Sequence, residues 1–188
     1  MVGERSSERG FKNAKIIVDG GFKDGRGGGV CQVSTTLYNC ALKSGLNIIE
    51  SHRHSLPVSY VAPSFDAMVS YGSCDLKFEN NSGAPLYISA VADGENLKVR
   101  FYGIESPYEY RLVSKVIKII EAKTKVIKRE ELKEDIREKR AKNGLLSEGY
   151  VCIYKDGKLL ETHKIREDVY KAVDGIIIEK DEDTVPET

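Results

Sequence analysis

The hydrophobic and polar positions along the chain predict one helix set among several strands. Residues 14–18 are largely apolar and precede Asp19-Gly20-Gly21, the pattern of a strand that ends in a turn. From Val30 onward, apolar residues recur at positions 30, 33, 37 and 41, which is the spacing of one buried helix face. We therefore expect a helix over about 30–44 with Gly45 as its stop, followed by a strand over 46–50.

Shorter apolar stretches separated by turns follow this helix. Residues 58–61 resemble a strand, residues 74–78 alternate as in a half-buried strand, and residues 86–91 and 97–102 flank the hairpin signal Asp93-Gly94. We expect an antiparallel meander that ends at Gly103–Pro107. The first domain is accordingly assigned to residues 1–104.

The remainder of the chain has a different composition, richer in lysine and glutamate. Alternation over 112–126, strand-like runs at 150–154 and 159–165, and the apolar run 175–178 predict a small β-rich domain over 105–180. The charged stretch 129–142 within it is interpreted as a solvated helix, and the acidic residues 181–188 as a disordered tail. The expected fold class is α+β, with one principal helix packed on an antiparallel sheet and a β-rich domain after it.

Cys31 lies where a glycine run, Gly27-Gly28-Gly29, meets the predicted helix, so it is a first-turn residue. Backbone N–H groups without helical partners and the positive end of the helix dipole both favour a thiolate there. The glycines allow a substrate backbone to approach closely, and the N–H groups of Gln32 and Val33 are candidates to hold an oxyanion. The alternative is a glycine loop leading into a core helix whose cysteine is a small buried hydrophobe.

Composition limits the class of protein. With 188 residues, 40% hydrophobic and 31% charged, the chain is long enough for an ordinary globular domain plus a small one. The formal net charge is zero, which gives no general case for a nucleic-acid partner. No apolar run is long enough to span a membrane and the first residues lack the apolar core of a signal peptide, so we expect no transmembrane segment, signal or anchor in this chain.

The four cysteines, Cys31, Cys40, Cys74 and Cys152, form no Cys-x-x-Cys pair and show no spacing typical of zinc sites. Cys31 and Cys40 are nine positions apart, which puts them on opposite faces of the predicted helix and prevents a bridge. We expect free thiols, no bound metal and no cofactor.

Two of the three histidines, His52 and His54, come directly after the strand predicted at 46–50. In an extended segment both side chains emerge on one face, and either histidine is a candidate to take the proton of Cys31 and return it to a leaving group. Asp66 is a candidate to orient that histidine. The alternatives are an exposed loop with two histidines, a metal site, and an aspartate that only caps a turn.

Residues 3–103 resemble the VanW family in a long, ordered set of motifs. The matching stretches are Gly27–Asn39, His52–Tyr60, Asp66-Ala67, Ser70-Tyr71-Gly72 and Asp75–Phe78. The β-rich region, with Gly149-Tyr150-Val151, Asp156-Gly157-Lys158 and Tyr170, is similar to the five-glycine domains that often follow VanW domains. Family domains usually begin some tens of residues earlier, so we expect an N-terminally shortened VanW-like domain.

VanW is named from a glycopeptide-resistance gene cluster, and members have been reported as L,D-transpeptidases of peptidoglycan that work through a cysteine. The resemblance implies that Cys31 is the nucleophile and that the His-x-His segment falls on His52 and His54. It also implies peptidoglycan stem peptides as partners and a location in the extracytoplasmic cell envelope.

These inferences lead to a cysteine acyltransferase of the cell wall as the first hypothesis. Cys31 attacks a stem-peptide carbonyl, and the side chains of Ser34, Thr35 and Tyr38, one or two turns along the helix, are candidates to contact the substrate together with Gly28 and Gly29. A non-catalytic module that binds the cell envelope is the second hypothesis. A hydrolase that uses the same residues with water as acceptor is the third.

Overall fold

The computed structural model describes residues 3–18, 21–94, 96–129 and 136–180, and it confirms the α+β class. Among these residues there is one helix, α1 (Val30–Lys43). The strands are β1 (Asn13–Val18), β2 (Gly21–Arg26), β3 (Asn47–Glu50), β4 (Lys77–Glu79), β5 (Tyr87–Ala92), β6 (Leu97–Tyr102), β7 (Glu109–Ile120), β8 (Thr124–Arg129), β9 (Ile136–Lys139), β10 (Gly144–Lys155), β11 (Lys158–Tyr170) and β12 (Gly175–Lys180).

Helix α1 has the bounds expected from its apolar spacing to within one residue. It starts after Gly29, whose φ of 91° is in the left-handed region, and it ends before Gly45, whose φ is 69°. The N–H of Gly45 donates to the carbonyl of Leu42 at 3.1 Å, which satisfies a carbonyl of the last turn. Glycine is suited to both ends because residues with a Cβ are strained at these φ values.

The strands that follow α1 form two separate antiparallel pairs, β3–β4 and β5–β6, so the single meander expected for residues 74–102 is wrong. Strand β4 starts only at Lys77, because Ser70 and Cys74 close a tight turn before it with an isolated bridge. The rings of Phe78 and Phe101 stack at 5.8 Å, so side chains join the two pairs. Residues 58–61, bounded by prolines, form a loop and not a strand.

The C-terminal region consists of two three-stranded sheets, in the orders β11-β10-β7 and β8-β12-β9. Strands β10 and β11 are joined by a tight turn in which Asp156 and Gly157 have φ values of 49° and 75°, as a two-residue hairpin requires. The helix expected over 129–142 is wrong where the structure describes that stretch, because β9 pairs with the edge of β12 and thereby obtains its backbone hydrogen bonds. The tail 181–188 lies outside the described residues.

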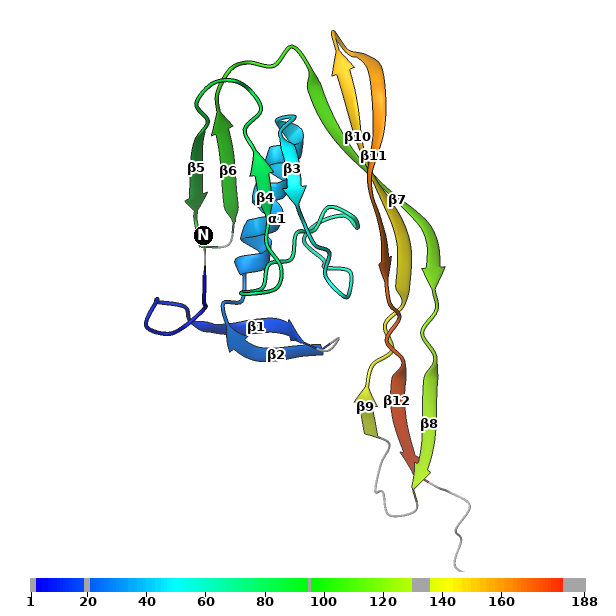
Figure 1. Cartoon of the computed structure of the whole chain (residues 1–188). Helices are drawn as coiled ribbons and strands as arrows, with labels where there is room; N and C mark the ends of the chain where they lie inside the picture. Colours follow the sequence, from blue (N-terminus) through cyan, green and yellow to red (C-terminus); the bar gives the residue numbers. More distant parts are fainter. Residues whose placement is uncertain (1–2, 19–20, 95, 130–135, 181–188) are drawn as a thin grey trace, which may run out of the picture.

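The long β7-β10-β11 sheet runs beside the part of the chain that contains α1, and the connection between β3 and β4 lies between them (Figure 1). One hydrophobic core joins the two regions. It is formed by Tyr38 and Leu42 of α1, Phe65 and Ala67 of the β3–β4 connection, and Val151 of β10. The connection 51–76 is therefore packed on both sides, by the helix and by the sheet.

Candidate active site

Cys31 is the second residue of α1 and follows a glycine turn in which Gly27 and Gly29 have φ values of 78° and 91°. Its side chain is half-buried, and the Sγ atom donates to the carbonyl of Val69 at 3.5 Å. The thiol thus points from the helix end toward the β3–β4 connection. All four cysteines, including Cys31, are free.

The N–H groups of Gln32 and Val33 are not free to hold an oxyanion as expected. Both donate to the carbonyl of Gly29, at 3.0 and 3.1 Å, because the carbonyl of the residue before a helix accepts its first intrahelical bonds. Within the described hydrogen bonds, the N–H of Cys31 itself has no acceptor. That N–H belongs to the nucleophile candidate itself and is a first-turn donor available to a carbonyl oxygen whose carbon Sγ attacks.

His54 is joined to Asp66 by two hydrogen bonds. The backbone N–H of His54 donates to Oδ2 of Asp66 at 2.6 Å, and the ring Nδ1 lies 2.7 Å from the same oxygen. Only 6% of His54 and 1% of Asp66 is exposed. Because a carboxylate accepts only, Nδ1 carries the proton in this pair and Nε2 is the ring nitrogen left for Cys31.

The thiol of Cys31 and the imidazole of His54 shift each other's ionisation. Burial raises the pKa of the Cys31 thiol, but its hydrogen bonds to His54 and Val69 and the nearby charges outweigh burial and hold the pKa below the ordinary value. Burial lowers the pKa of His54, yet the hydrogen bonds to Asp66 and Cys31 outweigh it and raise the pKa to about 9. Both shifts act in the same sense, because each favours the ion pair of a thiolate and an imidazolium over the neutral pair.

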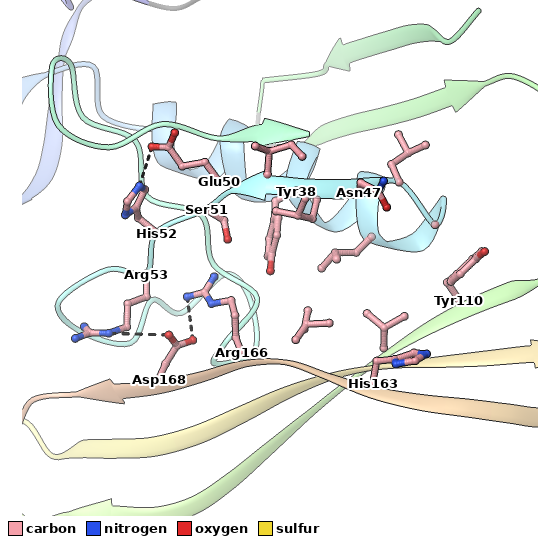
Figure 2. Close-up of a pocket in the computed structure, with 17 residues that line it drawn as sticks. Tyr38, Asn47, Glu50, Ser51, His52, Arg53, Tyr110, His163, Arg166 and Asp168 are labelled. Atoms are coloured by element: carbon pink, nitrogen blue, oxygen red, sulfur yellow. Dashed lines mark hydrogen bonds and ion pairs between the residues drawn. The ribbon is translucent and has the colours of Figure 1, made fainter. Parts of the chain in front are cut away.

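His52, the other histidine of the segment, lies apart from this pair. Its Nε2 atom is 2.9 Å from Oε1 of Glu50, and it lines a pocket of about 910 Å³ between α1, β3 and β11. Figure 2 shows His52 beside Glu50 in that pocket, together with the Arg166–Asp168 ion pair. Neither Cys31 nor Asp66 is among the described residues that line it.

Asp66 also has two partners, Tyr170 and Arg166, that could not be expected from the sequence. The hydroxyl of Tyr170 donates to Oδ1 of Asp66 at 2.5 Å, and the guanidinium of Arg166 donates to the Asp66 carbonyl at 2.6 Å. Burial raises the pKa of the Asp66 carboxyl, but His54, Tyr170 and Arg166 together hold it below its usual value. Both partners belong to β11, more than ninety positions along the chain, and no spacing pattern links them to Asp66.

Three helix side chains proposed as substrate contacts are engaged with the protein instead. The Ser34 hydroxyl donates to the carbonyl of Ala67 at 2.5 Å, and the Thr35 hydroxyl accepts from the N–H of Ala67 at 2.9 Å. Tyr38 is 1% exposed and belongs to the core. These contacts fix the position of the chain directly after Asp66, so they hold the site together from the helix side.

A second hollow, of about 580 Å³, follows α1 from Gln32, the residue after Cys31, toward β6, and Cys31 itself is not among the described residues that line it. Gln32 and Tyr60 line the end near the cysteine, and the Tyr60 ring lies edge-on to His54 with 6.4 Å between ring centroids. The basic side chains Lys43 and Arg100 line it as well. We refer to this hollow as the α1–β6 groove.

Among the described residues, no group of three or more His, Cys, Asp or Glu side chains is arranged to hold a metal ion. None of the helical segments described is long and apolar enough to cross a membrane.

The chain is similar to a G5 domain structure of an IgA1 protease, with 12% identity, 42% of this chain and 98% of that chain covered, and a TM-score of 0.28. A second G5 structure, that of HP0197, is 19% identical over 38% of this chain and 93% of that chain, with a TM-score of 0.23. TM-scores this low do not define a shared fold.

The N-terminal region gives a closer match. It is 41% identical over 102 residues to the uncharacterized protein YoaR of Bacillus subtilis (strain 168), which covers 54% of this chain and 34% of the relative. The chain thus spans about a third of the length of that relative. The family model described as VanW like protein matches residues 1–102, more than half of the chain. The chain therefore belongs to the family of VanW-like proteins.

Proposed function

We propose that this protein is a cysteine acyltransferase of the L,D-transpeptidase type that acts on peptidoglycan stem peptides. Membership of the VanW-like family relates the chain to the cell envelope, which supports this choice of substrate. The observation that carries the proposal is the row of Cys31, His54 and Asp66, in which a buried carboxylate holds the imidazole and the imidazole lowers the pKa of the thiol. Nucleophile, base and orienting group are the three parts that thiol acyl transfer requires.

In the acylation step, the Cys31 thiolate attacks the carbonyl that links a diamino acid to a terminal D-alanine. A sulfur–carbon bond forms, and the carbonyl oxygen becomes an oxyanion that the N–H of Cys31 is placed to stabilise. The His54 imidazolium then gives its Nε2 proton to the departing D-alanine nitrogen as the carbon–nitrogen bond breaks. The product is a thioester on Cys31 and a free D-alanine.

In the second step, the side-chain amine of a neighbouring stem attacks the thioester carbonyl. Neutral His54 takes a proton from that amine, the new amide bond forms, and the carbon–sulfur bond breaks to return the thiolate. Asp66 keeps its charge throughout, and holds Nδ1–H so that Nε2 exchanges the proton in both steps.

The α1–β6 groove supports this role because it starts at the residue after the nucleophile. From Gln32 to Lys43 the helix rises by about 16 Å, the length of about five extended residues, so a stem peptide fits along it. The groove is also lined by the ammonium group of Lys43 and the guanidinium of Arg100, which suit an acyl donor that carries carboxylates. We propose this groove as the binding site of the acyl donor.

Two other functions, a binding module and a hydrolase, predict different results in the experiment described below. A binding module has no need for a depressed thiol pKa beside a histidine, so the Cys31–His54 contact favours an enzyme. A hydrolase would use the same acylation step and differ only in the acceptor, since water in place of the amine releases a free carboxylate.

The test is mass spectrometry of the intact protein after exposure to a carbapenem and, separately, to a stem tetrapeptide with and without an amine acceptor. We expect an adduct on Cys31 that is absent in Cys31→Ala. Cys40→Ala is the matched control, because Cys40 is a free thiol on the same helix that lines the α1–β6 groove, and burial raises its pKa above the ordinary value. An adduct rate unchanged in Cys31→Ala would overturn the assignment, and a product formed only with water would assign a hydrolase.

A further inference from the structure

The C-terminal β-rich region supplies side chains to the candidate active site. Of the two carboxylate oxygens of Asp66, Oδ2 accepts both hydrogen bonds from His54, and Oδ1 accepts from the Tyr170 hydroxyl at 2.5 Å. The Nη2 atom of Arg166 lies 3.6 Å from the same Oδ1. The oxygen that does not serve His54 is thus held entirely by β11 within the described contacts.

The backbone just before Asp66 is fastened to the same sheet. The N–H of Ser64 donates to the Tyr170 hydroxyl at 2.9 Å, and the Ser64 and Ser147 hydroxyls lie 2.7 Å apart. The hydroxyl of Ser114 donates to the carbonyl of Pro63 at 2.7 Å. Ser64 has a φ of 66°, a conformation that is costly without a tertiary restraint, and these bonds provide that restraint.

Tyr170 occupies a position that only a hydroxyl can satisfy. Its oxygen accepts one hydrogen bond from Ser64 and donates one to Asp66, while the residue as a whole is 1% exposed. Burial and the Asp66 charge raise the pKa of Tyr170, so the phenol stays protonated and remains a donor. The donated proton stabilises the ionised form of Asp66, and that charge in turn favours the His54 imidazolium.

Arg166 is held by contacts of its own. One nitrogen donates to the Asp66 carbonyl at 2.6 Å, another lies 2.9 Å from Oδ2 of Asp168, and the guanidinium carbon is 5.8 Å from the centre of the Tyr38 ring. Its side chain is 12% exposed. A guanidinium fixed in this way places a permanent positive charge next to Asp66 without occupying the oxygen that His54 uses.

From these contacts we infer that Tyr170 and Arg166 are positioning residues for the nucleophile, so the catalytic unit comprises the VanW-like region and β11 together. Neither touches Cys31 in any described contact. They act through Asp66 and His54, and removing them should weaken the ionisation of the Cys31 thiol. The inference rests on the proposed function for its consequence in acyl transfer, but its effect on thiol ionisation can be measured without any substrate.

The experiment uses the full chain with Tyr170→Phe, which removes one oxygen and keeps the ring. The rate of alkylation of Cys31 by iodoacetamide is measured against pH in a Cys40→Ala, Cys74→Ala, Cys152→Ala background. We expect the thiol pKa to rise and the rate just below neutral pH to fall about 10-fold, as expected for the loss of one hydrogen bond to a charged group. Tyr108→Phe, which removes an exposed hydroxyl beside β7, should leave the profile unchanged.

A second variant, Arg166→Lys, keeps the positive charge but loses the forked contact with Asp66 and Asp168. It should shift the thiol pKa in the same direction by a smaller amount. Circular dichroism establishes that each variant is folded. The inference is overturned if both folded variants keep the wild-type profile. If instead both profiles shift while wild-type protein forms no adduct with carbapenem or stem peptide, the proposed function fails and the positioning role stands.

Discussion

The two histidines two positions apart in the sequence should behave in opposite ways when they are replaced. His54 lies between Asp66 and Cys31, whereas His52 is bound to Glu50 at 2.9 Å and lines the pocket of Figure 2. Glutamine is the suitable replacement at both sites, because its amide can donate to the neighbouring carboxylate and leaves no buried oxygen without a partner. The comparison of His54→Gln with His52→Gln therefore tests the geometry with a control from the same segment.

The size of the effect follows from the ionisation of the thiol. Without His54, the factors that remain largest are burial, which raises the pKa of Cys31, and the hydrogen bond to Val69, which lowers it. A thiol that returns to the ordinary pKa of about 8.5 is only about 3% ionised at neutral pH, so the fraction of thiolate should fall. Loss of the proton donor to the leaving group should reduce turnover further, by about 10²-fold to 10⁴-fold.

The assay measures iodoacetamide alkylation and carbapenem acylation of Cys31 across the pH range, with Cys40, Cys74 and Cys152 replaced by alanine. In wild-type protein, the midpoint of the rise in alkylation rate should lie below the ordinary thiol pKa, and acylation should decline as pH rises through about 9, where His54 loses its proton. In His54→Gln, the alkylation rate should rise once with pH, with a midpoint near or above the ordinary thiol pKa. The reasoning is refuted if His54→Gln keeps the wild-type profile, or if His52→Gln loses it.

Three further outcomes are expected. Gly29→Ala should lower stability by about 1–2 kcal/mol in thermal unfolding, because a Cβ there meets no atom but is strained at a φ of 91°; an unchanged melting temperature would contradict this. The pKa of His54 is raised from 6.5 to about 9 in the folded protein, so its contribution to the free energy of unfolding is complete below about pH 6.5 and is lost as pH rises through 9. The difference in unfolding free energy between wild type and His54→Gln should therefore shrink over that range. Arg100→Glu should raise KM several-fold for a carboxylate-bearing donor at low salt and leave kcat unchanged, and the absence of any salt-dependent change would exclude the α1–β6 groove as the donor site.

The helix and its cysteine could be predicted because their signals are local. Apolar spacing from Val30 and a glycine at each end define α1 without reference to the rest of the chain. The strands of the hairpin at Asp156-Gly157 are predictable for the same reason, since the turn residues have the conformations that the turn requires.

The partners within the site could not be chosen from the sequence. His54 meets Asp66 because the irregular connection 51–76 folds back between α1 and β10, and no periodic pattern describes such a path. The Gln32 and Val33 N–H groups were expected to be free, but Val33 makes the first regular helical bond to the carbonyl of Gly29, the residue before the helix, and Gln32 shares that acceptor. The charged stretch before residue 142 has the composition of a helix surface, and its described part forms a strand because β12 offers an open edge.

The hydrogen bond between Tyr170 and Asp66 also sets an order of events during synthesis. The two residues are 104 positions apart, so at about 5–20 residues per second the ribosome needs on the order of 5–20 s to reach Tyr170 after Asp66 has been made. Over that interval Asp66 lacks its β11 partners and the Cys31 thiol lacks the full support for its ionisation. A nascent chain would therefore carry a less reactive cysteine, and the nucleophile would gain its reactivity only when the last long strand docks.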